Sequence, residues 1–310
     1  YTVIPRTSDT TASHPGSPNL SCSMAAFSPT ATLLVSCPDQ RGLVAAVSNF
    51  IFEFDGNIIH ADQHTDLEEG TFLQRVEWEL DGFGLERAAI AGRFTPVAAG
   101  FGMDWSLRFS DDRPRIAIFV SQQAHCLYDL LARWRMDELR TDIPLVVSNH
   151  AELGSVAGEF GIEFHHLPIT TETKAAQEAA ARRLLVEHNI DTVVLARYMQ
   201  ILSPDFVDAY PNNIINIHHS FLPAFAGARP YHQAHERGVK VIGATAHYVT
   251  ADLDAGPIIA QDVAGVSHRD SVTDLVRTGR DLEKVVLAKA VRLHIDNRVL
   301  VYGNRTVIFD

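Results

Sequence analysis

The chain is poor in cysteine, in basic residues and in long apolar runs. Its 3 cysteines are odd in number and form no C-x-x-C pair, so neither a disulfide framework nor a thiolate zinc site is indicated. Lys and Arg number 26 against 38 Asp and Glu, and the formal net charge of −12 argues against a nucleic-acid partner. No apolar run approaches the ~18 residues of a membrane span. We therefore expect a protein of the reducing cytoplasm, with no membrane and no nucleic acid among its partners.

What is present is the composition of an ordinary globular protein. Hydrophobic residues make up 46% and charged residues 21%, close to the usual values. The length of 310 residues predicts two domains, because single cores stop growing beyond about 250–300 residues. The first 23 residues contain 13 Ser, Thr, Pro or Gly and show no apolar period. Residues 1–30 are therefore expected to be a disordered leader that carries no chemistry.

Residues 31–110 have the pattern of a small α/β domain. Apolar spacing predicts strands near 32–35, 57–66, 72–80 and 105–109, and helices over 43–54 and 85–99. This βαββαβ order is the ferredoxin-like arrangement. With the turn at residues 38–43, Pro-Asp-Gln-Arg-Gly-Leu, it resembles the ACT domain, a family of regulatory modules that often bind amino acids as paired copies.

The ACT resemblance implies a regulatory ligand and a paired assembly. It places an amino-acid effector at the helix-opening turn, on Asp39, Gly42 and Leu43, and it implies a homo-oligomer. A simpler interpretation is that these residues only form the turn, with Pro38 fixing φ and Gly42 taking a positive φ. The module would then serve dimerisation alone.

Residues 114–310 alternate apolar strands with amphipathic helices. Strands are expected at 116–120, 143–147, 164–168, 192–195, 214–217 and 244–249, helices near 127–139, 155–160, 173–188 and 273–295, and a terminal hairpin around 302–305. Continuous apolar strands separated by helices predict a Rossmann-like, mostly parallel sheet covered on both faces. Ligands of such sheets bind at the carboxyl ends of the strands. The polar strand ends are therefore the candidate sites.

One strand end carries an amide and an imidazole together. Strand alternation places Asn216 and His218 on the same side of the strand that begins at Ile214. A carboxamide and an imidazole in this arrangement can both donate to a carbonyl oxygen that becomes anionic during a reaction. The alternative is that the two side chains only cap the strand end.

A second polar loop, Asp252-Leu-Asp-Ala-Gly-Pro257, follows the strand at 244–249. Two acids before Gly-Pro are usually just a turn. A carboxylate beside an imidazole, however, raises the pKa of the imidazole and can accept a proton from an attacking water. Asp254 with Asn216 and His218 would form a set for attack on an acyl or formyl carbon without a covalent nucleophile.

These motifs resemble one enzyme family. Asn216-x-His-x-Ser-x-Leu-Pro223 followed by His247-x-Val-x-x-x-Leu-Asp-x-Gly-Pro257 is similar to the signature of formyltetrahydrofolate-dependent formyltransferases, and residues 199–202, Met-Gln-Ile-Leu, match the folate-pocket stretch of that family. The preceding ACT-like domain and long runs at 125–131, 143–150, 216–225 and 227–234 make the deformylase branch of the family the most similar.

The resemblance implies an activity and roles for individual residues. The activity is hydrolysis of 10-formyltetrahydrofolate to tetrahydrofolate and formate, which would supply formate for one-carbon and purine metabolism. Asn216 and His218 would hold the formyl oxygen and Asp254 would manage the proton. Neither cofactor nor metal is expected. The residues expected to bind substrate are Met199, Gln200, Leu202, His219, His247, Asp252 and Leu253.

Departures from the transferase pattern favour water as the acceptor. The turn at 120–126 has no glycine where transferases carry a Gly-rich phosphate cradle, and His219 replaces a Pro. Gln200 stands where transferases have Arg, which leaves the partner of the folate glutamate open. Three alternatives stay open: transfer to an amine acceptor, a catalytically silent amino-acid sensor, and a metal site among the histidines at 218, 219, 232, 235 and 247.

Overall fold

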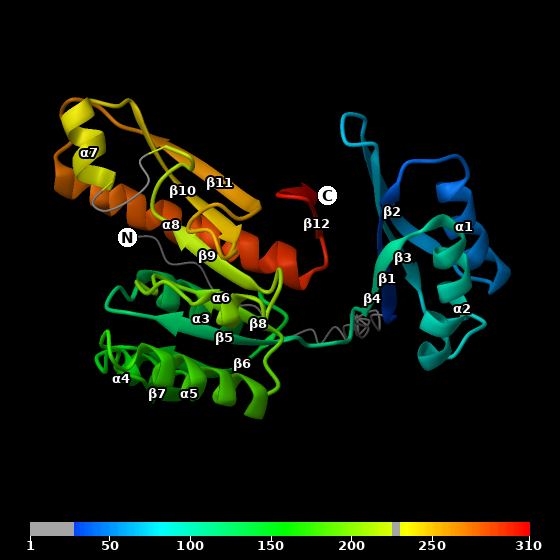
Figure 1. Ribbon diagram of the computed structural model, residues 1–310, viewed down its shortest axis with the longest axis horizontal. Coiled ribbons are helices and arrows are strands. Elements are labelled where there is room, and N and C mark those ends of the chain that lie inside the picture. Colours follow the sequence, from blue (N-terminus) through cyan, green and yellow to red (C-terminus); the bar gives the residue numbers. More distant parts are fainter. Residues whose placement is uncertain (1–27, 225–229) are drawn as a thin grey trace, which may run out of the picture.

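The computed structural model of the protein describes residues 28–224 and 230–310. Of the leader expected over residues 1–30, residues 1–27 lie outside the described residues. Two domains lie side by side, and a C-terminal hairpin lies between them (Figure 1). No helix among the described residues is long and apolar enough to cross a membrane.

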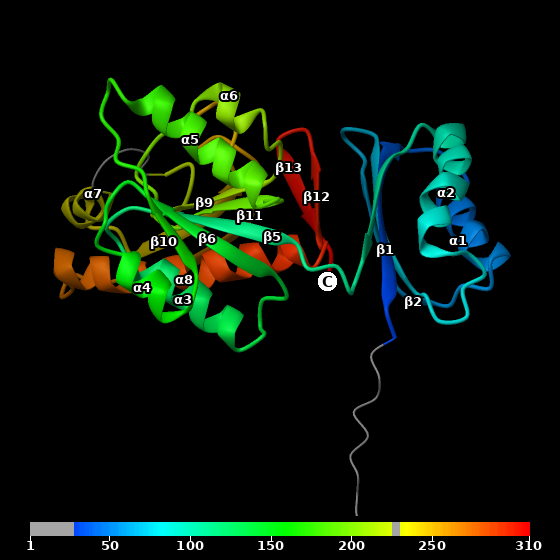
Figure 2. The same ribbon diagram turned by 90° about the horizontal axis from the view of Figure 1, so that it is seen from below.

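The N-terminal domain is a four-stranded antiparallel sheet covered by two helices on one face (Figure 2). The strand order is β2-β3-β1-β4, which confirms the predicted ferredoxin-like fold. Its elements are β1 (Thr30–Pro38), α1 (Leu43–Glu53), β2 (Ile58–Asp66), β3 (Thr71–Glu79), α2 (Arg87–Phe101) and β4 (Asp104–Phe109).

The two faces of this sheet differ in chemistry because strand side chains alternate. Leu33, Val76 and Trp78 face the helices and are at most 1% exposed. On the opposite face, β1 pairs Leu34 with Arg75 of β3. This second, more polar face is turned toward the C-terminal domain, since Arg75 Nε donates to the carbonyl of Asn297 at 3.0 Å.

The C-terminal domain is built on a seven-stranded sheet of order β11-β10-β9-β8-β5-β6-β7. The strands from β9 to β7 are parallel, whereas β10 runs antiparallel to both of its neighbours, β9 and β11, which confirms a mostly parallel α/β fold. Its elements are β5 (Arg115–Val120), α3 (His125–Arg135), β6 (Asp142–Ser148), α4 (Gly154–Glu159), β7 (Glu163–His166), α5 (Lys174–Glu187), β8 (Thr192–Leu195), α6 (Pro204–Val207), β9 (Ile214–His218), α7 (Pro230–Arg237), β10 (Val241–Tyr248), β11 (Ile258–Gly265) and α8 (Val272–Ile295).

Helices cover both faces of this sheet. Apolar residues of α3, α4 and α8 pack on one face, and those of α5 and α6 pack on the other. The helix expected to reach residue 139 ends at Arg135, and β11 is a strand that the sequence pattern did not predict. The exposed residues of β11 interrupt the alternation of buried and exposed side chains that is typical of a strand, because β11 is the edge strand of the sheet.

The predicted terminal hairpin is confirmed as β12 (Val299–Tyr302) and β13 (Arg305–Ile308). Leu300 and Phe309 pack against Leu73 of the N-terminal domain. On the other side, Asn304 Nδ2 donates to the carbonyl of Ala255 at 2.9 Å. The hairpin therefore connects the polar face of the N-terminal sheet to the loop that carries Asp254.

Candidate active site

Two neighbouring antiparallel strands position Asn216 and His247. Asn216 on β9 lies directly opposite His247 on β10. Asn216 Nδ2 lies 3.2 Å from His247 Nε2, while His247 Nδ1 lies 2.8 Å from the carbonyl of Tyr248. Because a carbonyl only accepts, Nδ1 is the protonated nitrogen and Nε2 accepts from the amide. Burial lowers the pKa of His247, so this ring is a neutral support that orients Asn216.

Asp254 reaches the same point from the loop that follows β10. Its Oδ2 lies 3.2 Å from His218 Nδ1, and its Oδ1 lies 3.7 Å from His247 Nε2. The loop is tight: Asp254 has a positive φ of 54°, and a Cβ at Gly256 would lie 1.9 Å from the carbonyl oxygen of Tyr248. The hydrogen bond from His218 lowers the pKa of Asp254, so the carboxylate is ionised at neutral pH.

Two side chains of the triad of Asn216, His218 and Asp254 have a nitrogen that can still donate a hydrogen bond. His218 is 5% exposed, and its Nε2 is buried without a hydrogen-bond partner among residues 28–224 and 230–310. A buried polar atom without a partner costs stability and indicates a group held for a ligand. Asn216 Nδ2 also has a second hydrogen beyond the one given to His247. The two groups can donate to one oxygen.

Five of the predicted substrate-binding residues lie on loops, and they differ in exposure. Met199 follows β8 and Leu253 precedes Asp254, and these apolar side chains are 57% and 64% exposed. Gln200 and Leu202 are partly buried, and Asp252 is exposed. Exposed apolar side chains beside polar donors are typical of a surface for an aromatic ligand.

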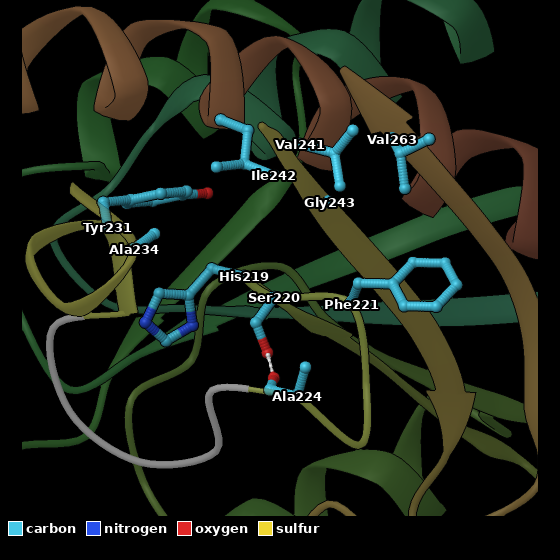
Figure 3. A pocket seen from close by; sticks show the side chains of 10 residues that line it. All are labelled: His219, Ser220, Phe221, Ala224, Tyr231, Ala234, Val241, Ile242, Gly243 and Val263. Carbon is cyan, nitrogen blue, oxygen red and sulfur yellow. Dashed lines mark hydrogen bonds between the residues drawn. The ribbon is translucent and has the colours of Figure 1, made fainter. Parts of the chain in front are cut away.

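His219 borders a separate apolar cavity of about 300 Å³ (Figure 3). Phe221, Tyr231, Ile242 and Val263 are among its walls, and none of the triad residues lines it. The ring of His219 lies 5.1 Å from that of His218 and 6.0 Å from that of Tyr231, measured between centroids. Burial, with the charges of Arg197 and His218, lowers the pKa of His219 to about 4, so this imidazole is neutral.

A buried carboxylate on α8 organises a cluster behind His219. Glu283 is 1% exposed and receives His125 Nε2 at 2.7 Å and the hydroxyl of Tyr231 at 2.8 Å. Arg197 Nε lies 3.4 Å from the same carboxylate. Burial alone would raise the pKa of Glu283, but the hydrogen bond from His125 and the charge of Arg197 outweigh it and lower the pKa.

This Glu283 cluster was not predicted as part of the site. The sequence did hold one indication that Glu283 is buried. This glutamate is four residues after Gly279 and shares the apolar face of its helix with Val286 and Leu287. Gly279 serves the same cluster, because a Cβ there would lie 2.0 Å from the hydroxyl of Tyr231.

Two groups of side chains among the described residues have the spacing for a metal ion, His125 with Cys126 and Glu283, and Glu163 with His165 and His188. Neither contains a triad residue. In the first group, Arg197 already supplies a positive charge and burial raises the pKa of the Cys126 thiol, which disfavours the thiolate that a metal needs.

The predicted effector turn is exposed. Asp39 is exposed, and Gly42 has a φ of 94° that favours glycine. The side chain of Leu43 is 2% exposed and packs in the domain core, so only its backbone faces the turn. An effector at this turn stays a prediction.

Comparisons with known proteins agree with this architecture. Residues 31–89 match the ACT domain family and residues 114–291 match the formyl transferase family. Formyltetrahydrofolate deformylase of Synechocystis sp. is 63% identical over 280 residues, which cover 90% of this chain and 98% of that protein. The Bacillus subtilis deformylase is 49% identical, with 90% and 93% covered.

Solved structures give the same picture. A formyltetrahydrofolate deformylase from Pseudomonas syringae matches with a TM-score of 0.91 and 48% identity, over 93% of this chain and 96% of that one. Glycinamide ribonucleotide transformylase 1 from Symbiobacterium toebii matches with a TM-score of 0.62 and 34% identity, over 66% of this chain and 98% of that one.

Proposed function

Because the chain belongs to the formyltetrahydrofolate deformylase family, we propose that it hydrolyses 10-formyltetrahydrofolate to tetrahydrofolate and formate. The observation that carries the proposal is the pair of His218 and Asp254. Asp254 holds one ring nitrogen of His218, and the other is buried and unpartnered within the described chain, two residues along β9 from Asn216. The formate released supplies one-carbon and purine metabolism.

The first part of the mechanism is stabilisation of charge on the formyl oxygen. Asn216 donates the second hydrogen of its Nδ2, and a protonated His218 donates from Nε2. Negative charge develops on this oxygen only as the tetrahedral intermediate forms, so both hydrogen bonds strengthen toward the transition state. Asp254, at 3.2 Å from His218 Nδ1, holds the imidazolium in place.

The second part is movement of protons. Water forms a bond to the formyl carbon and gives its proton to Asp254. The bond between the formyl carbon and N10 then breaks, N10 leaves with a proton, and formate is released. The oxygen of water ends in formate, one of its protons ends on N10, and the other enters the solvent.

Water, rather than an amine, is the acceptor in this proposal. The turn at 120–126 has no glycine, so fewer backbone N–H groups can come close to the phosphate of a phosphorylated amine. The helix that follows this turn begins at His125, which is held by Glu283. Transfer to an amine is not favoured, because the relatives that match most of the chain are deformylases.

The proposal includes no cofactor and no metal in the reaction. The imidazoles beside Asp254 are committed to that carboxylate, to Asn216 and to the Tyr248 carbonyl. It also includes a homo-oligomer paired through the N-terminal domains, an effector at the Asp39 turn, and a cytoplasmic location. In that compartment the buried free thiols of Cys37 and Cys126 stay reduced.

Incubation of the full chain with 10-formyltetrahydrofolate alone tests the proposal. We expect formate and tetrahydrofolate in equal amounts, with the same rate after dialysis against EDTA. Glycinamide ribonucleotide is then added in a parallel reaction. Formyl transfer to this amine, with no formate released in its absence, would overturn hydrolysis. Folate binding without turnover would identify a silent sensor instead.

A further inference from the structure

A cluster of two histidines and a glutamate lies where the edge strand β7 meets the C-terminal end of α5 (Figure 1). Glu163 and His165 are two residues apart on β7, so their side chains point to the same side of the strand. His188 is the C-terminal cap of α5. Because β6, β5 and β8 lie between β7 and β9 in the sheet, this cluster is separate from the triad.

The donor atoms of the three side chains lie close to one another. Glu163 Oε1 is 2.7 Å from His165 Nε2, and Oε2 of the same carboxylate is 3.6 Å from His188 Nε2. One ligand atom from each residue lies within 4.8 Å of the other two. Around a tetrahedral Zn²⁺ with bonds of about 2.0–2.2 Å, ligand atoms are about 3.3–3.6 Å apart. Small side-chain rotations therefore bring these three atoms to one ion.

One of these atoms is a buried nitrogen without a hydrogen bond. His165 Nε2 has no hydrogen-bond partner among residues 28–224 and 230–310. Its contact with Glu163 is short, but the carboxylate does not lie in the direction of the ring N–H. An ion pair alone favours alignment, because the aligned charge-assisted hydrogen bond is the strong one. Two ligands of one ion are offset, because the ion, and not the second ligand, lies in front of the nitrogen.

The surroundings of the cluster favour a cation. Glu163 gives it a negative charge, and His188 lies at the negative end of the α5 dipole. The Glu163 side chain is 54% exposed, so the carboxylate can move to admit an ion. One cation approaches from β5, since Arg115 Nε donates to the His188 carbonyl at 2.6 Å. Its guanidinium also lies 3.9 Å from the Asp142 carboxylate, which offsets its charge.

The donor types select the class of ion. Imidazole nitrogens suit Zn²⁺ and similar transition-metal ions, whereas Mg²⁺ and Ca²⁺ prefer oxygen ligands. Two histidines and one carboxylate leave a fourth tetrahedral position for water. We propose that Glu163, His165 and His188 bind a divalent transition-metal ion of the Zn²⁺ type, and that the ion joins β7 to the end of α5. This ion takes no part in the proposed hydrolysis.

An ion at this position stabilises one edge of the sheet. β7 has 4 residues, and its sheet partner is β6. Short elements with few contacts are the first to open locally. The unfolded chain does not hold the three ligands together, because His188 comes from a different element than Glu163 and His165. Binding of the ion therefore favours the folded chain.

Calorimetric titration of the tag-free full chain with Zn²⁺ tests the site. We expect saturable binding of one ion per chain. His165→Gln and His188→Gln should each weaken it by at least about tenfold, the smallest loss expected when even a supporting group of a metal site is removed. Mg²⁺ should not compete. Circular dichroism in the absence of metal checks that each variant is folded.

His166→Gln is the matched control. His166 is the next residue of β7, is exposed and points to the other side of the strand. Unchanged affinity in His166→Gln, with weaker binding in both His165→Gln and His188→Gln, supports the site. No saturable binding of Zn²⁺ would overturn it. So would equal affinity in the native chain and the two site variants, or an equal loss in His166→Gln.

Thermal unfolding tests the connection between β7 and α5. Saturating Zn²⁺ should raise the melting temperature of the native chain and of His166→Gln, and it should leave that of His188→Gln unchanged. Binding at the site with no rise in the melting temperature of the native chain would overturn the connection. None of these measurements depends on turnover, so the outcome is independent of the proposed function.

Discussion

Two of the clusters in the C-terminal domain that combine a carboxylate with histidine differ in what is left unpaired. The side chain of Asp254 is 18% exposed, and its partner His218 keeps a buried ring nitrogen to which no described residue makes a hydrogen bond. The side chain of Glu283 is 1% exposed, and both its oxygens are taken, by the hydroxyl of Tyr231 and by His125.

This difference teaches that residue type does not by itself determine a catalytic role. A carboxylate with both oxygens already hydrogen-bonded has a structural role, because a substrate could bind it only by breaking one of those hydrogen bonds. A carboxylate that holds a histidine with a free nitrogen can move a proton to a substrate. Of these two clusters, the first has a buried histidine nitrogen without a hydrogen-bond partner in the described chain, so it is the one proposed for the chemistry.

The largest effect is expected on turnover, and it should distinguish Asp254 from Glu283. Asp254→Asn should lower kcat by about 10²–10⁴-fold, because the group that manages the proton is lost. The melting temperature should change little, since this loop is partly exposed. Formate release and thermal unfolding measure the two quantities, and near-normal turnover would remove Asp254 from its proposed role.

Glu283→Gln is the matched control for that variant. It should lower the free energy of unfolding by about 3 kcal/mol, because the charge of Arg197 would be left buried without its counter-ion. The kcat of the folded fraction should fall far less than in Asp254→Asn. The opposite result, with stability unchanged and turnover abolished, would make Glu283 a reacting group.

A smaller effect is expected at the donor to the formyl oxygen. Asn216→Ala should lower kcat by about 10²–10³-fold while KM changes little, because the hydrogen bond strengthens only in the transition state. Steady-state kinetics of formate release separate the two constants. A rise in KM at unchanged kcat would show that Asn216 binds the substrate in its ground state.

The last prediction concerns the pH dependence of stability. His219 and His294 have a pKa of about 4 in the folded chain, below the ordinary 6.5. Between these values the unfolded chain binds protons that the folded chain does not. The free energy of unfolding should therefore fall as the pH drops from 6.5 to 4, by up to about 1.4 kcal/mol per pH unit for each histidine.

Urea unfolding at successive pH values measures this slope, and His294→Gln should reduce it while the shares of His219 and His247, whose pKa values are also lowered, remain. Asp254 and Glu283 have lowered pKa values, so their share of the stability is lost only at lower pH, below the ordinary carboxylate range. A flat profile between pH 4 and 6.5 would contradict the burial of two neutral imidazoles.

The sequence by itself determined the order and type of most elements, because apolar spacing is a local property. It predicted the βαββαβ domain, the parallel strands and the strand that carries Asn216 and His218. The approach of Asp254 to His218 was only one interpretation of the sequence, since a turn with two acids has no distinctive local pattern, and the family resemblance then favoured it.

Only the tertiary structure decided which charged groups meet. Glu283 lies in a helix and Arg197 follows a strand far earlier in the chain, and no local period links them. The physical reason is that partnering depends on strand register, loop conformation and domain packing, which bring distant residues together only when the whole chain is folded.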